Sequence, residues 1–155
     1  MQRGLEGYSF RRKQKAPVTG VTLAGRSQDA LPNSALPDFQ AFRRGIEQFN
    51  SGHFFDAHET WEEIWLRSPE PDKTFLQGII QVAAAFHHHS RSNPRGARSL
   101  LEAGLARLDR FPDAHRGIAL AALRAGALAW VASLDDADTA GTEVPLPRIE
   151  SAEND

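Results

Sequence analysis

Apolar residues recur at helical spacing through the middle of the chain, between two polar ends. Phe39, Phe42, Ile46 and Phe49 lie three or four positions apart, which places them on one face of a helix. The same spacing continues further along the chain. The pattern predicts five helices, at about residues 37–52, 53–67, 72–90, 93–111 and 113–134.

Proline, glycine and asparagine separate these predicted helices. Gly52 suits a left-handed helix stop, and Pro69 and Pro71 break the chain after the second helix. Asn93 followed by Pro94 is a cap and first-turn pair for the fourth helix. The connections are short, and neither strand-like alternation nor an internal repeat is present. We therefore predict an all-α fold, a compact bundle whose neighbouring helices are mostly antiparallel.

Composition changes this picture at the two ends. The chain has 155 residues, enough for one domain, and its 41% apolar and 25% charged residues are typical of a soluble globular protein. Residues 1–36 carry six Arg or Lys against two acids, and residues 135–155 carry seven acids against one Arg. Neither end has a sustained apolar period. We expect one helical domain at 37–134 between a disordered basic N-terminal tail (1–36) and a disordered acidic C-terminal tail (135–155).

Several classes of protein are disfavoured by the same composition. No run of 18 apolar residues is present, so no membrane partner is expected, and no apolar segment follows the first basic residues as a secretory signal requires. The chain has no cysteine, which fits a cytoplasmic protein. Residues 37–134 carry eleven charges of each sign, so this domain is not expected to bind nucleic acid. Only the basic N-terminal tail has the excess of positive charge that such binding requires.

The second predicted helix places two polar residues on its apolar face. On a helical wheel Phe54, His58, Trp61, Glu62 and Trp65 fall within about 100° of arc. An ionised carboxylate on a buried face is costly unless it is paired or bound to a cation, and the imidazole lies one turn away. The face is therefore expected to hold something polar.

The third predicted helix has a second polar stripe. Gln77, Gln81 and His88 lie opposite the large apolar residues of this helix, spaced four and seven positions apart. His88 is one of three consecutive histidines, which point 100° apart, so only one of them can face a shared site. If the two helices are antiparallel neighbours, this stripe meets His58 and Glu62 in one interior pocket.

Two interpretations of these residues stay open. In the first, His58, Glu62 and His88 bind one unidentified divalent metal or a small polar ligand, and the pocket is completed by other side chains of the two helices. If the site is catalytic, a metal-activated water with Glu62 or His58 as base is the simplest chemistry. The pocket residues are Phe54, Trp61, Trp65, Gln77 and Gln81.

In the second interpretation the same residues form a hydrogen-bonded network that only fixes packing. The protein is then structural or binds a partner, and its aromatic stripe, with Trp130 on the last helix, is core or the interface of a homo-oligomer. The stretch HETWE departs from the metalloprotease pattern H-E-x-x-H, because Glu62 stands where the second His belongs. Whether the protein is an enzyme is left open.

Three separated motifs carry a family resemblance. The stretches FNSGHFFDAHETWEEIW, FLQGIIQVAAAFHH and SNPRGARSLL together resemble a bacterial and archaeal family known only as domain of unknown function 309. Its signature H-x-x-x-E-x-x-W is found here at His58, Glu62 and Trp65, and the resemblance covers roughly residues 37–110. It implies an all-helical fold and a suspected metal-binding role for the motif, with Trp65 as a wall of the pocket.

Overall fold

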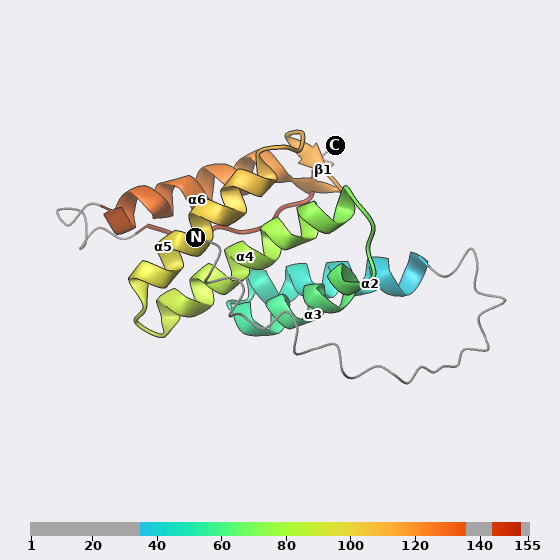
Figure 1. Cartoon of the computed structure of the whole chain (residues 1–155), viewed down its shortest axis with the longest axis horizontal. Coiled ribbons are helices and arrows are strands. Elements are labelled where there is room, and N and C mark those ends of the chain that lie inside the picture. The colour runs from blue at the N-terminus through green and yellow to red at the C-terminus, as the bar shows by residue number, and fades with distance from the viewer. Residues whose placement is uncertain (1–34, 136–143, 153–155) are drawn as a thin grey trace.

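The computed structural model describes residues 35–135 and 144–152. Nearly all of the expected N-terminal tail, residues 1–34, lies outside the described part of the chain. Figure 1 shows a long helix through the middle of the bundle, with the other helices on either side of it. The elements in chain order are α2 (Ala35–Asn50), α3 (Phe54–Leu66), α4 (Asp72–Ser90), α5 (Pro94–Leu108), β1 (Ala114–His115), β2 (Ile118–Ala119) and α6 (Leu120–Asp135).

The all-α fold predicted from the sequence is confirmed. α4 is the central helix and packs against α3 on one side and α5 on the other, while α2 covers α3 and α6 covers α5. In the described ranges, no helix combines the length and the apolar character needed to cross a bilayer.

The ends of the helices follow local rules that the sequence displays. Asn93 caps α5, because its side-chain oxygen accepts a hydrogen bond from the Gly96 amide at 3.1 Å, and Pro94 occupies the first turn. Gly52 lies in the turn that follows α2, and its φ of 85° is in the left-handed region that favours glycine. α4 begins at Asp72, directly after the proline break.

α3 and α4 are antiparallel and share an aromatic core with α2. Phe54, at the start of α3, lies 5.4 Å from the ring of Phe86 near the end of α4. Trp65, near the end of α3, lies 4.4 Å from the ammonium group of Lys73 in the first turn of α4. Trp61 is fully buried and donates its indole N–H to the carbonyl oxygen of Phe42 at 3.1 Å. The rings thus fix both the direction and the register of this helix pair.

α4 and α5 approach each other closely at two glycines, Gly78 and Gly104. A Cβ atom on Gly104 would lie only 2.8 Å from the carbonyl oxygen of Gly78. A Cβ on Gly78 would lie 2.8 Å from Leu108. Carbon atoms need about 3.5–4.0 Å, so glycine at these two positions is what allows the helix contact.

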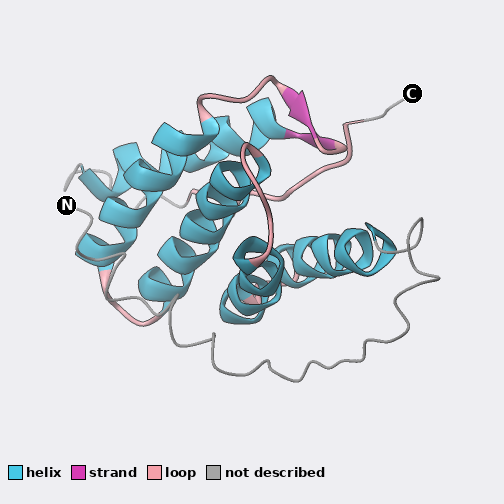
Figure 2. Ribbon diagram, turned by 45° about the vertical axis from the view of Figure 1, so that its right-hand side comes forward, coloured by secondary structure: helices cyan, strands magenta, loops and turns pink. Residues whose placement is uncertain are grey.

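The chain between α5 and α6 forms a short hairpin, where the sequence analysis expected a helix from residue 113. β1 and β2 pair antiparallel through Ala114–Ala119 and His115–Ile118. Arg116 (φ 51°) and Gly117 (φ 80°) both take the left-handed conformation, which is the requirement of a type I′ turn and is incompatible with a helix. Figure 2 shows this hairpin at the end of the bundle away from the α4–α5 turn.

Part of the expected C-terminal tail packs on the bundle. Residues 144–152, here called the C-terminal segment, run beside α6 toward the hairpin (Figure 1, red). Ile149 is buried, at 4% exposure, and Ser151 pairs with Ile118 of β2. The other residues of the expected tail, 136–143 and 153–155, lie outside the described part of the chain.

Candidate functional site

The two polar residues singled out on α3 are both buried in the bundle. His58 is 2% exposed and Glu62 is fully buried, one helical turn further along. The helical wheel placed both on the buried face, and the structure agrees. A carboxylate and an imidazole in an aromatic core are the strongest chemical anomaly of the described chain, because burying either group is costly without compensation.

Phe55 connects His58 to the surface. Its ring stacks on the imidazole with centroids 5.7 Å apart and planes inclined by 22°, yet the side chain is 44% exposed. The ring of Phe55 also lies close to the ring of His87 on α4, with centroids 5.1 Å apart. Burial lowers the pKa of His87, and the nearby His88 and Arg91 lower it further. Phe55 was not predicted from the sequence, although its i, i+3 spacing from His58 places the two side chains next to each other on the helix.

The aromatic residues expected to line the pocket have other contacts. Phe54 packs its ring against Phe49 at 5.1 Å and against Phe86. Trp61 faces α2, so closely that a Cβ on Gly45 would overlap its indole ring. Trp65 lies beneath Lys73, whose ammonium group also donates to the Trp65 carbonyl oxygen at 3.1 Å.

Gln81 of the glutamine stripe of α4 lies against α5. Gln81 is 1% exposed, and its side-chain oxygen accepts a hydrogen bond from the Arg107 guanidinium of α5 at 3.3 Å. Burial lowers the pKa of Arg107. Gln77, one turn earlier, is half-buried. Gln81 therefore contributes to the α4–α5 contact. Its hydrogen bond is with Arg107 of α5, not with His58 or Glu62 of α3.

His88 is bound to the cap of α5. The Gly96 amide donates to the Asn93 side-chain oxygen, which orients the Asn93 amide nitrogen toward His88 Nδ1 at 3.0 Å. That nitrogen is a donor, so Nδ1 must accept and the ring proton lies on Nε2. Burial lowers the pKa of His88, which favours this neutral form. In this tautomer neither ring nitrogen offers a lone pair to a metal.

A three-residue metal centre is not preformed in residues 35–135 and 144–152. Over these ranges, no group of three or more His, Asp or Glu side chains has an arrangement that could hold a metal ion. Of the three predicted ligands, His58 and Glu62 share one face of α3 and His88 is engaged by Asn93 at the α4–α5 turn.

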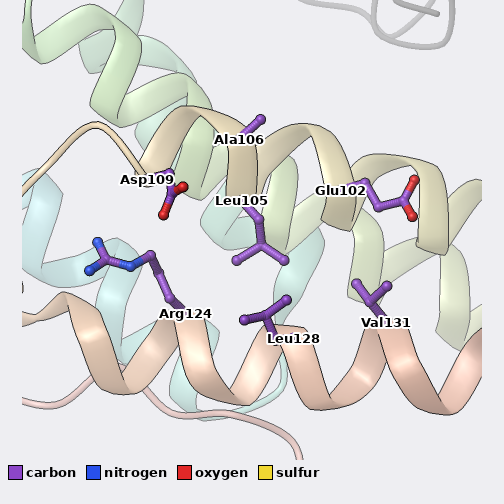
Figure 3. Close-up of a pocket in the computed structure, with 7 residues that line it drawn as sticks. All are labelled: Glu102, Leu105, Ala106, Asp109, Arg124, Leu128 and Val131. Atoms are coloured by element: carbon purple, nitrogen blue, oxygen red, sulfur yellow. The ribbon is translucent and has the colours of Figure 1, made fainter.

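A groove of about 370 Å³ lies on another part of the molecule, between α5 and α6. Figure 3 shows Leu105 and Leu128 facing each other across its middle, with Asp109 and Arg124 at one end and Glu102 at the other. Leu128 is 58% exposed. None of the residues predicted from the sequence as ligands or pocket walls lines this groove.

Comparison with known proteins finds a family match in the middle of the chain. Residues 42–100 match the family described as Domain of unknown function (DUF309). The resemblance stated from the sequence is confirmed over this segment, which contains α3, α4 and the cap of α5.

Two relatives share the same region. An "Uncharacterized protein" of Aquifex aeolicus is 36% identical over 78 residues, which are 50% of this chain and 23% of the relative. The "Uncharacterized protein YpuF" of Bacillus subtilis is 37% identical over 57 residues, 36% of this chain and 33% of the relative. The chain thus spans a third or less of each of these relatives.

Proposed function

We propose that the domain is a binding module whose ligand is held at His58 and Glu62 of α3, and that the ligand is a divalent metal ion or a small polar molecule. Phe55 covers this site on the solvent side. The observation that carries the proposal is the burial of an imidazole and a carboxylate, at 2% and 0% exposure, one turn apart in an aromatic core.

The position of Phe55 supports access to the site. Its ring stacks on His58 and is 44% exposed, so a rotation of this one side chain would open a path to the imidazole. Side chains on the outside of a helix change rotamer in picoseconds to nanoseconds. A ligand can therefore reach a buried pair without unfolding α3.

The donor atoms suit a divalent ion in kind. Imidazole nitrogen and carboxylate oxygen are the usual protein ligands of zinc and related metals. His58 and Glu62 supply two donors, and a bound water or ligand group would supply the others. Such an ion would polarise a bound water or carbonyl group, and the Glu62 oxygen that does not bind the ion would be the group that accepts a proton.

A structural role is the second candidate. The hydrogen bonds Gln81–Arg107 and His88–Asn93 show that polar residues of α4 are used for helix packing in this fold. If His58 and Glu62 act in the same way, they only fix the register of α3. The two roles differ in what they predict for the metal content and for the stability of variants.

The first test is elemental analysis of untagged protein that has never met a nickel column. We expect near-stoichiometric divalent metal in the wild type and its loss in both His58→Ala and Glu62→Gln. His89→Ala is the matched control, since His89 is exposed and lies in the run of three histidines that could bind metal adventitiously. Metal retained by the control and lost by the two α3 variants would support the site.

Stability separates the alternatives when no metal is found. A structural network predicts that His58→Ala lowers the free energy of unfolding by about 2–5 kcal/mol, because a buried polar pair is broken. A binding site predicts a neutral or stabilising change, since sites often trade stability for function. Metal-free protein in every sample, together with a large loss in urea melts of His58→Ala, would overturn the proposal.

A further inference from the structure

The C-terminal segment lies in a groove built from three parts of the chain. Asn50, at the end of α2, makes two hydrogen bonds to one backbone unit: its amide nitrogen donates to the Ile149 carbonyl oxygen at 3.0 Å, and its oxygen accepts from the Ile149 amide at 2.8 Å. On α6, the Trp130 indole donates to the Pro145 carbonyl oxygen at 2.9 Å. The third part is the hairpin.

The hairpin extends the recognition to the end of the segment. The Ala119 amide donates to the Glu150 carbonyl oxygen at 2.8 Å, and the Ala152 amide donates to the Gly117 carbonyl oxygen at 2.9 Å. These bonds add the segment to the edge of β2, which is how extended peptides are bound by β-augmentation. All five hydrogen bonds named for the segment use its backbone, and they fix its direction and register.

Shape adds specificity to these backbone bonds. Gly126 of α6 forms a notch for Pro147, because a Cβ at this position would lie 2.8 Å from the proline Cβ. Ile149 is 4% exposed, whereas Leu146 is 49% exposed and Arg148 is also exposed. The alternation of covered and exposed side chains is that of an extended peptide read on one face. Pro145 is exposed and is held through its carbonyl oxygen, so the side-chain pattern that the groove fits is Pro-x-Ile at residues 147–149.

We propose that this groove is a peptide-docking site and that its partner is the C-terminal segment of a second copy of the chain. The segment follows α6 after residues 136–143, so its own protomer presents it to the groove. A second copy presents the identical sequence, and exchange between protomers keeps every hydrogen bond described above. Exchange of identical elements is a low-cost route to a dimer.

The protein concentration decides whether the segment docks in the groove of its own protomer or in that of a second copy. Residues 136–143 alone separate α6 from the segment in the sequence, and a tether of this length corresponds to an effective concentration of about millimolar. Exchange is therefore weak in dilute wild-type protein and becomes dominant when docking within one protomer is blocked. This property permits a complementation test with two full-length variants.

Asn50→Ala weakens the groove and leaves the segment intact, and Ile149→Asp weakens the segment and leaves the groove intact. We expect each variant alone to be a monomer of 17.1 kDa by light scattering after size exclusion, at about 100 µM, well below the tether's effective concentration. In an equimolar mixture the segment of the first variant can dock in the groove of the second. A heterodimer of twice the monomer mass is expected there and nowhere else.

A labelled peptide with the sequence of residues 143–152 reports on the groove directly. Fluorescence anisotropy should show binding to full-length Ile149→Asp, and adding Asn50→Ala to that chain should weaken binding about tenfold or more, because two hydrogen bonds are lost. Wild type should bind the peptide more weakly, since its own segment occupies the groove. The control peptide has both prolines replaced by serine.

Helical content by circular dichroism shows that the variants are folded. Gly126→Leu repeats the groove side of the test by filling the notch for Pro147, and Ile149→Ala repeats the segment side with a milder change. A folded mixture that stays monomeric, with no peptide binding to Ile149→Asp or Ile149→Ala, overturns the proposal. Peptide binding without a heterodimer also overturns the exchange, and would assign the groove to a peptide of another protein.

Discussion

The two sides of α4 are packed on opposite principles. Toward α3 the contact is made by large rings, with Phe54 and Phe86 in contact and Phe49 behind them. Toward α5 the contact depends on two glycines, Gly78 and Gly104, because a Cβ at either position would clash with the other helix. One helix therefore has one side whose stability depends on filled volume and another whose stability depends on close backbone approach.

The polar residues follow the same division. On the α3 side, His58 and Glu62 are buried, and the imidazole of His58 stacks on Phe55. On the α5 side, Gln81 is bonded to Arg107 and His88 to Asn93. The comparison teaches that polar residues of one bundle differ in role: Gln81 and His88 bond to residues of α5 and its cap, and His58 and Glu62 on α3 are the ones for which a ligand is proposed.

Removing a ring should have the largest effect. Phe54→Ala deletes most of a side chain that is 8% exposed, and we expect it to lower the free energy of unfolding by about 3–5 kcal/mol. Phe54→Leu, which keeps more of the volume, should cost clearly less. Chemical denaturation of both variants measures the difference. Equal losses in the two would mean that volume is not what stabilises the α3 side.

Adding one methyl group should destabilise the other side. The Cβ of Gly104→Ala would meet the Gly78 carbonyl oxygen at 2.8 Å, and overpacking costs about 1–3 kcal/mol. The better helix propensity of alanine offsets about 1 kcal/mol of this. Ser99→Ala, at an exposed position of the same helix, should be neutral or slightly stabilising. A Gly104→Ala variant as stable as wild type would show that α4 and α5 do not need this approach.

The smallest effect is expected at the polar contact between α4 and α5. Gln81→Leu removes a buried amide whose nitrogen has no hydrogen-bond partner among the described residues, so its stability should stay within about 1 kcal/mol of wild type. Arg107→Met alone leaves the Gln81 oxygen buried without this donor and should cost about 1–2 kcal/mol. In a thermal-melt double-mutant cycle the double variant should recover part of this loss; strict additivity would contradict the coupling.

Local signals in the sequence were sufficient for much of the bundle. The apolar period predicted the course of α4, and the Asn93–Pro94 pair predicted where α5 begins, because capping involves residues close in the chain. The same period predicted that His58 and Glu62 would be buried, since the face of a helix depends only on spacing. The left-handed turn at Arg116–Gly117 was missed, although Gly117 was a local sign of it.

What the sequence determined by itself is therefore the set of helices, the start of α4 and of α5, and the buried face of α3. Only the tertiary structure decided which helix each buried face meets: that Gln81 lies against Arg107, that Gly78 lies against Gly104, and that Asn50 holds the backbone of Ile149, 99 positions away. The physical reason is range. Helix propensity and capping act over a few residues, whereas close packing and backbone hydrogen bonds between distant segments depend on atoms that the fold alone brings together.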